Sequence, residues 1–233
     1  MEAYIRAVQG LTAGETVQWK GNSLRLSWKP KRVPVFVGGQ GPRVLGMAGR
    51  VADGAIVGGG VTSPERVRQM LGYVEAGAKQ AGRKMQDFEM WWLVRVVVAP
   101  SVEEGINMMR DYLAGHGAHS YMAASTLAEA PPEVQEQIHV LEREYKWQEH
   151  LTGKVGRDGM TDNARLLERT GIKRWLANRF VITGPPEHCI AGLQRLVDAG
   201  AHNFMIPQVL PGHRESTLLL GTTVFPAFRT PGR

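Results

Sequence analysis

The chain has 233 residues, 43% of them hydrophobic and 21% charged, which supplies enough apolar mass for a buried core and excludes global disorder. Its one cysteine, Cys189, excludes a disulfide scaffold and favours a reducing, cytoplasmic setting. The net charge of +6 comes from scattered Lys and Arg residues without a basic helix or an aromatic platform, so we expect no nucleic-acid binding. A solvated basic surface is the expectation, and attraction of an anionic small molecule is the alternative.

Strand-like and helix-like segments alternate along most of the chain, after a leading helix at 2–13 and a hairpin at 15–28 that turns at Lys20-Gly21-Asn22. Short apolar, β-branched runs predict strands at 33–37, 55–57, 89–99 and 202–206. Apolar residues at helical spacing predict helices at 42–51, 64–81, 101–114, 185–199 and 215–225. Strands that are apolar on both faces and separated by amphipathic helices indicate an α/β fold with a parallel sheet.

The longest apolar segment, 90–100, is interrupted by Arg95 and is too short to cross a bilayer, so we expect no membrane association. The first ten residues lack the basic and apolar regions of a secretion signal. Together with the single thiol, these features predict a cytoplasmic protein.

A long, polar and mostly helical segment, 116–177, interrupts the strand–helix alternation. Within it a helix is expected after Pro131-Pro132, with one apolar stripe made of Val134, Ile138, Leu141 and Tyr145. Excursions of this length inside a βα repeat are uncommon unless they form a lid or an interface. We therefore predict one domain over 1–233, with 116–177 as a helical insertion.

The segment Gly38-Gly39-Gln40-Gly41-Pro42 lies between a predicted strand and a predicted helix. Glycines allow backbone amides to approach a ligand closely, and the start of a helix carries partial positive charge. Arg43 in the first turn opposes the helix dipole unless an anion lies nearby, which favours a phosphate site. The segment matches neither a dinucleotide-binding fingerprint nor a Walker loop, so tight βα turns without a ligand are the alternative.

A second glycine loop, Gly58-Gly59-Gly60-Val61, follows the second predicted strand. Its helix begins with Glu65, which already complements the helix dipole, so this loop is less suited to hold an anion alone. Backbone amides of Gly59, Gly60 and Val61 are expected to form the other wall of a shared site.

Together these segments resemble the C-terminal half of the luciferase-like flavin-dependent oxidoreductases, and most strongly their coenzyme F-420 (deazaflavin) dependent, methylenetetrahydromethanopterin reductase-like branch. The resemblance lies in five stretches: 33–42, 47–56, 81–83, 98–104 and 181–187. It implies a (β/α)8 TIM barrel of which this chain supplies about four βα units and the insertion. It also implies that the cofactor phosphate is held by Gly38, Gly39, Gln40, Gly41, Arg43, Gly59, Gly60 and Val61.

The same resemblance implies an oxidoreductase that uses reduced coenzyme F-420 or FMN for hydride transfer to, or monooxygenation of, a small organic substrate. The family's catalytic residues lie in the half of the barrel that has no counterpart here, so none is assigned. Half a barrel leaves strand edges unpaired, and we expect a truncated chain that a second copy or a completing chain covers. The alternative is a non-catalytic half-barrel that keeps only the phosphate-binding glycine loops, here called the phosphate cradle. A phosphate-binding barrel of another family is a third interpretation.

Four further residues each allow a functional and a structural interpretation. His116 and His119 have the spacing of two metal ligands, but no third ligand nearby completes a set, so we expect no metal. Arg95, inside an apolar strand, either pairs with a buried carboxylate or reaches the barrel mouth. Cys189, near the start of a helix, is expected to be a structural thiol.

Overall fold

A computed structural model of the chain describes residues 1–58, 62–119, 127, 130–150, 154–207 and 214–228. The chain divides into two compact units. Unit 1 comprises Met1–Gly58, Pro64–Leu93 and Val197–Met205, and unit 2 comprises Gly59–Ser63, Val94–Leu196 and Ile206–Arg233.

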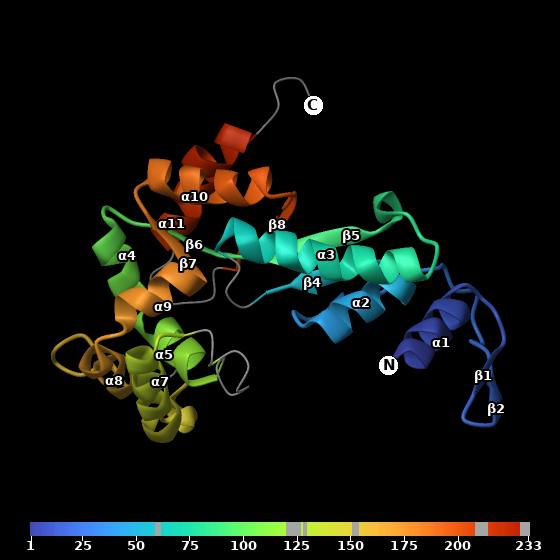
Figure 1. The fold of residues 1–233 in the computed structure, drawn as a ribbon, viewed down its shortest axis with the longest axis horizontal. Helices are drawn as coiled ribbons and strands as arrows, with labels where there is room; N and C mark the ends of the chain where they lie inside the picture. The colour runs from blue at the N-terminus through green and yellow to red at the C-terminus, as the bar shows by residue number, and fades with distance from the viewer. Residues whose placement is uncertain (59–61, 120–126, 128–129, 151–153, 208–213, 229–233) are drawn as a thin grey trace. The chain divides into compact units, whose positions relative to one another are not determined.

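Unit 1 contains a parallel four-stranded sheet with the strand order β3-β4-β5-β8 (Figure 1). Its elements are α1 (Glu2–Thr12), β1 (Val17–Trp19), β2 (Asn22–Leu24), β3 (Phe36–Gly38), α2 (Pro42–Val51), β4 (Gly54–Val57), α3 (Pro64–Gln80), a 3-10 turn (Met85–Asp87), β5 (Glu89–Leu93) and β8 (Asn203–Met205). The antiparallel pair β1-β2 confirms the predicted hairpin, in which Lys20 and Gly21 take φ values of 50° and 82°. The parallel sheet confirms the α/β prediction.

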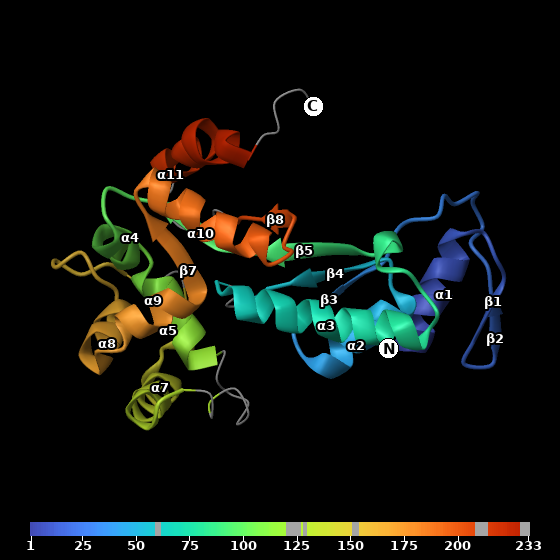
Figure 2. The same ribbon diagram turned by 45° about the horizontal axis from the view of Figure 1, so that its top comes forward.

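Helices cover one face of this sheet. Side chains alternate between the two faces along a strand, and Ala55, Val57 and Trp92 on one face are fully buried, each at 0% exposure. Val37, which pairs with Ala55 and so shares this face, packs against a small cluster that includes Met47 of α2. This face therefore forms the core of unit 1, with α2 and α3 side by side over it (Figure 2).

The opposite face of the sheet is apolar but open. Ile56, Trp91 and Leu93 are only partly buried, and Met205, which pairs with Leu93, is 39% exposed. A sheet between helices normally buries both faces. Unit 1 thus carries one apolar surface of the sheet that its own helices leave uncovered.

Glycines bring α2 and α3 into close contact. A Cβ atom added at Gly77 would overlap the carbonyl group of Gly46, with 2.7 Å to the carbonyl carbon. A Cβ atom added at Gly49 would lie 2.9 Å from the backbone nitrogen of Ala78. The backbones of the two helices therefore touch directly.

Unit 2 is mainly helical and contains the parallel pair β6-β7. Its elements are β6 (Arg95–Val98), α4 (Val102–Met108), α5 (Arg110–His119), α7 (Pro132–Glu144), a 3-10 turn (Trp147–Glu149), α8 (Asp162–Thr170), α9 (Lys173–Phe180), β7 (Val181–Gly184), α10 (Pro186–Asp198, whose last two residues belong to unit 1), α11 (Arg214–Leu219), a π-helical turn (Leu220–Val224) and a 3-10 turn (Phe225–Phe228). The predicted helix after Pro131-Pro132 is α7, and its apolar stripe is confirmed because all four residues are buried.

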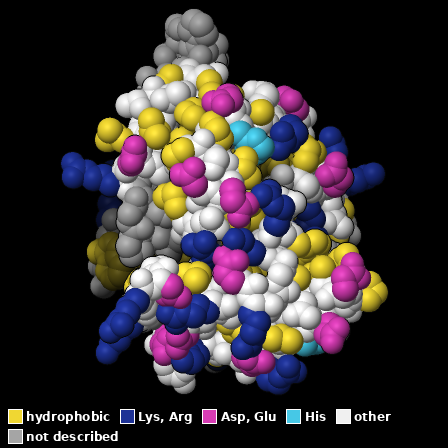
Figure 3. Space-filling view, turned by 90° about the vertical axis from the view of Figure 1, so that its left-hand side faces the viewer, with side chains coloured by type: hydrophobic (Ala, Val, Ile, Leu, Met, Phe, Trp, Pro, Cys, Tyr) yellow, Lys and Arg dark blue, Asp and Glu magenta, His cyan; other side chains and the backbone are white. Residues whose placement is uncertain are grey.

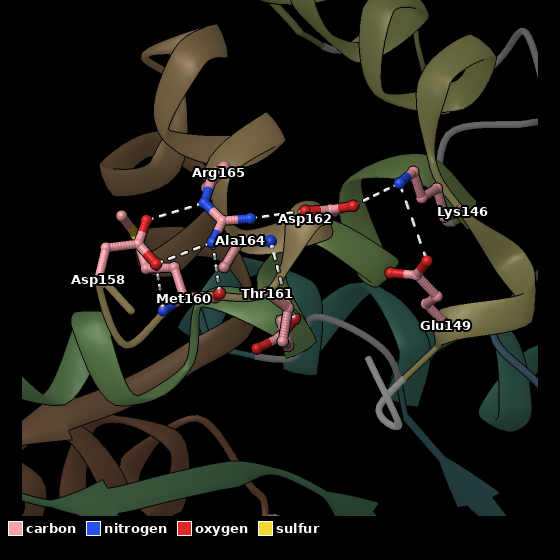
Figure 4. A network of polar contacts seen from close by, with 9 residues as sticks. Lys146, Glu149, Asp158, Met160, Thr161, Asp162, Ala164 and Arg165 are labelled. Atoms are coloured by element: carbon pink, nitrogen blue, oxygen red, sulfur yellow. Dashed lines mark hydrogen bonds and ion pairs between the residues drawn. The ribbon is translucent and has the colours of Figure 1, made fainter. Parts of the chain in front are cut away.

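Ion pairs hold the segment before α8 in place (Figure 4). Arg165 binds both Asp158, with a 2.8 Å Nε–Oδ2 distance, and Asp162, which also pairs with Lys146. Thr161 caps α8 by accepting a 3.0 Å hydrogen bond from the Ala164 amide. On the face shown in Figure 3, basic and acidic side chains are interleaved rather than gathered into one basic patch.

The structure corrects several predicted elements. The strand β7 was not counted among the four predicted strands, although it pairs along its whole length with β6. The predicted strand 89–99 is divided at Val94 into β5 and β6, and the predicted helix 101–114 is divided at Met109 into α4 and α5. The predicted helix 215–225 is α-helical only to Leu219, beyond which the hydrogen bonding widens to a π-helical turn.

Candidate phosphate-binding site

The two glycine loops begin at the same edge of the sheet in unit 1. Gly38 ends β3 and pairs with Ile56, while β4 ends one residue later at Val57. Because carboxyl ends of parallel strands lie at one edge, Gly38 and Gly58 leave the sheet side by side. Gly59, Gly60 and Val61 lie outside the described residues, so the structure describes only the first loop and the start of the second.

The first loop has the local geometry that an anion site requires. α2 begins at Pro42 after Gly41, which has φ −80° and ψ 157°, and neither a side-chain cap nor an acidic residue occupies the first turn. The first amides of a helix have no acceptor within it and carry partial positive charge. Cβ atoms added at Gly38 or Gly41 would meet nothing within 4 Å, so open space lies beside the backbone here.

Gly39 and Arg43 differ from the other residues predicted to bind the phosphate. The Gly39 amide donates a 3.2 Å hydrogen bond to the Ile56 carbonyl and is therefore already engaged. Arg43 is exposed and lines a groove of about 480 Å³ between α2 and α3, together with Arg50 and Tyr73. Among the described residues, the amides that remain for a ligand are those of Gln40 and Gly41 and, in the first turn of α2, those of Arg43 and Val44, since Pro42 has no N–H group.

The residue that follows the second loop is anchored in unit 2. The Thr62 hydroxyl donates hydrogen bonds to the carbonyls of Asn178, at 3.0 Å, and Arg179, at 2.8 Å. Both acceptors lie in the last turn of α9, where carbonyls lack partners within the helix. Thr62 therefore ties the end of this loop to α9.

A cavity of about 510 Å³ lies at the opposite, amino-terminal edge of the sheet. Its lining includes Phe36, Asp53, Trp92, His202 and Asn203. The Trp92 indole nitrogen is buried and has no hydrogen-bond partner among the described residues. The sequence did not predict this cavity, because its residues come from the starts of four strands that only the sheet brings together.

Asp53 in this cavity is a structural carboxylate. Burial would raise its pKa, but hydrogen bonds from the Val35 amide, at 2.7 Å, and from Arg32 and Gln9 outweigh burial, so the pKa lies below its usual value. An ionised, hydrogen-bonded Asp53 links the segment before β3 to the start of β4.

Among the residues that the structure describes, Arg95 does not form the predicted pair with a buried carboxylate. Its guanidinium carbon lies 4.5 Å from the centre of the Tyr112 ring, and its Nη1 donates a 2.6 Å hydrogen bond to the Pro207 carbonyl. Its Nε is buried without a partner among the described residues. The sequence indicated an unusual cation in an apolar strand, but could not show that an aromatic ring takes the place of a counter-ion.

His116 and His119 both lie against aromatic rings. The His116 ring is 4.0 Å from Tyr112 and 5.1 Å from Phe180, and His119 meets the edge of Trp147 at 6.1 Å. Burial, with a smaller effect of the Arg95 charge, lowers the pKa of His116 to about 4. Among the described residues, no group of three or more His, Cys, Asp or Glu side chains could hold a metal ion.

Cys189 is buried, and its sulfur lies 3.5 Å from the Gly184 carbonyl oxygen. Burial, with a smaller effect of Glu187, raises the pKa of this thiol to about 12. A protonated, buried thiol fits the structural role.

None of the described helices has the length and apolarity that crossing a membrane requires.

Residues 1–203 match the family model for luciferase-like monooxygenases, and the chain belongs to this family. It is 24% identical to a 5,10-methylenetetrahydromethanopterin reductase of Methanolobus tindarius, over 93% of this chain and 62% of that protein. It is 23% identical to an F420-dependent glucose-6-phosphate dehydrogenase of Microbacterium testaceum, over 97% of this chain and 59% of that protein.

The fold is similar to that of the coenzyme F420 dependent tetrahydromethanopterin reductase from Methanopyrus kandleri. The TM-score is 0.69 at 16% identity, covering 98% of this chain and 61% of that one. The chain therefore spans about three fifths of the length of these relatives.

Proposed function

We propose that this chain forms part of a (β/α)8-barrel oxidoreductase that acts on a small organic substrate with reduced coenzyme F-420 or FMN. Membership of the luciferase-like family is the observation that carries the proposal. Two relatives named above are a methylenetetrahydromethanopterin reductase and an F420-dependent dehydrogenase, which favours hydride transfer by coenzyme F-420 over monooxygenation.

The residues present fit the phosphate of such a cofactor. Gly38 and Gly41 leave open space beside the backbone, and the start of α2 has no capping side chain or acidic residue that would compete with an anion. We assign the phosphate to Gly38, Gln40 and Gly41, with Arg43, and to Gly59, Gly60 and Val61 from the second loop. Gly39, whose amide is engaged by the Ile56 carbonyl, belongs to the loop but does not donate to the phosphate. The bound cofactor would supply the redox chemistry, while these residues hold and orient it.

The open face of the sheet supports the half-barrel part of the proposal. In a closed barrel the inward side chains pack against those of the other strands. Here Ile56, Trp91, Leu93 and Met205 leave that surface uncovered. We propose that further βα units cover it, either in a longer polypeptide or in a second chain, and that 116–177 is an insertion into one partial domain over 1–233.

Cofactor retention by the purified chain tests the proposal. The chain is mixed with coenzyme F-420 or FMN and desalted, and its absorption spectrum is recorded; retention of one cofactor is expected. Gly38→Ala and Gly41→Ala place a methyl group in the open space and should weaken retention at least about tenfold, the effect of losing a charge-assisted hydrogen bond. Gly72→Ala on α3, where a Cβ also meets nothing within 4 Å, is the matched control.

The same uncovered face favours one other function, a non-catalytic half-barrel that keeps only the phosphate cradle. A folded chain that retains neither cofactor would support this module and contradict the oxidoreductase. Substrate-dependent bleaching of the retained cofactor would support the enzyme.

A further inference from the structure

Unit 2 contains a cation, Arg95, that no acidic side chain among the described residues neutralises. None of the described carboxylates forms an ion pair with Arg95. By contrast, most of the arginines of unit 2 that do form ion pairs have a carboxylate within 3 Å. The Arg95 contacts are the Tyr112 ring at 4.5 Å and the Pro207 carbonyl at 2.6 Å. The Nε–H group of this guanidinium is buried and unpaired among the described residues.

The neighbours of Arg95 do not supply negative charge either. Tyr112 is 8% exposed, and burial raises the pKa of its hydroxyl, so the phenol is neutral. His116, stacked on Tyr112, has a pKa of about 4 and is neutral at pH 7. The guanidinium therefore carries a full positive charge between uncharged aromatic groups.

Such an arrangement is costly to the folded chain by itself. A half-buried charge loses hydration, and a buried N–H group without an acceptor loses a hydrogen bond. A cation–π contact compensates only partly. Because an unpaired buried charge is destabilising, a ligand that brings a negative group and an acceptor would compensate it.

We propose that Arg95 binds one anionic group of a ligand, a carboxylate or a phosphoryl group, and that Tyr112 is a positioning residue that fixes the plane of the guanidinium. A planar guanidinium forms paired hydrogen bonds with these two groups. Arg95 is only partly buried, so part of its side chain is accessible to a ligand. If the ligand is the organic substrate of the oxidoreductase, that substrate is an organic acid or a phosphate ester; this last step rests on the proposed function.

Thermal unfolding of the full chain tests the site. The wild-type chain is unfolded in sodium acetate, sodium phosphate and sodium chloride at constant ionic strength. An oxyanion that binds should raise Tm by about 3 °C or more at ten times its Kd relative to chloride. A response to acetate and phosphate alike indicates a general oxyanion site, and a response to phosphate alone that is reduced in Arg95→Met indicates a phosphoryl ligand.

Variants separate this site from other anion sites. Arg95→Met should abolish the acetate response and lower the phosphate response, to which the proposed phosphate site at the glycine loop also contributes. Its Tm in chloride should be unchanged or higher, because an unpaired charge is removed. Arg95→Lys keeps the charge without the planar fork and should weaken the response about tenfold. Gly38→Ala, in the predicted cofactor loop, should leave the acetate response unchanged, so failure of the proposed cofactor function would not remove that response.

Two results would overturn the assignment. One is an equal oxyanion response in wild type and Arg95→Met; the other is no oxyanion response in wild type. A lower Tm of Arg95→Met in chloride, with the response retained, would identify a structural cation. If the variants unfold, NMR of the arginine side chains of the wild-type chain decides. Phosphate should shift one solvent-protected Nε–H resonance, and an unchanged spectrum would contradict the site.

Discussion

Acidification should destabilise this protein through His116 before its carboxylates are protonated. The His116 ring is packed between Tyr112 and Phe180, and its pKa is about 4 in the folded state against an ordinary value of 6.5. Arg95, His119 and His150 are the charged or titratable groups that disfavour its protonation. Below pH 6.5 the unfolded chain therefore binds one proton more than the folded chain, so stability falls as the pH is lowered.

The size of the effect follows from the two pKa values. The contribution is complete above pH 6.5 and is lost progressively down to about pH 4, for a total of about 3 kcal/mol. Between pH 7.5 and pH 5 the loss should be about 2 kcal/mol. Urea unfolding at these two pH values measures it, since a change in midpoint at constant m value reports stability.

His116→Phe is the control variant for this prediction. Phenylalanine keeps an aromatic ring between Tyr112 and Phe180 but cannot bind a proton. Its stability should be nearly flat from pH 7.5 to pH 5, because the carboxylates whose pKa lies below the usual value, such as Asp53 and Glu168, titrate at lower pH. Equal losses of stability in wild type and His116→Phe would refute the reasoning.

Three substitutions test packing and capping contacts in the two units, each measured by urea unfolding. Gly77→Ala should lower the free energy of unfolding by about 2 kcal/mol or more, because the added Cβ overlaps the Gly46 carbonyl. Gly72→Ala in the same helix should raise it by about 0.5–1 kcal/mol. Equal effects of the two substitutions would contradict the close helix contact. Asp53→Ala should cost about 1–3 kcal/mol by removing the acceptor of three hydrogen bonds; an unchanged midpoint would show that these bonds are not formed. Ser101→Ala should cost about 1 kcal/mol by removing the cap of α4, and Ser101→Thr, which keeps a hydroxyl, should recover most of it.

The sequence by itself determined the elements that local chemistry specifies. The spacing of apolar residues located α3 and the stripe of α7, and Ser101 with Glu104 marked the start of α4. The glycines after β3 marked the start of α2 and the candidate phosphate loop. These features depend on neighbours within one or two helical turns, so no tertiary contact was needed to find them.

Only the tertiary structure decided the features that depend on distant residues. The four residues of β7 follow directly after α9, and they are recognisable as a strand only through their pairing with β6. The Arg95 site likewise combines a strand, the helix α5 and Pro207, which is 112 residues away in the chain. A buried guanidinium gains or lacks a counter-charge according to what folds around it, and the residues next to it in sequence do not carry that information.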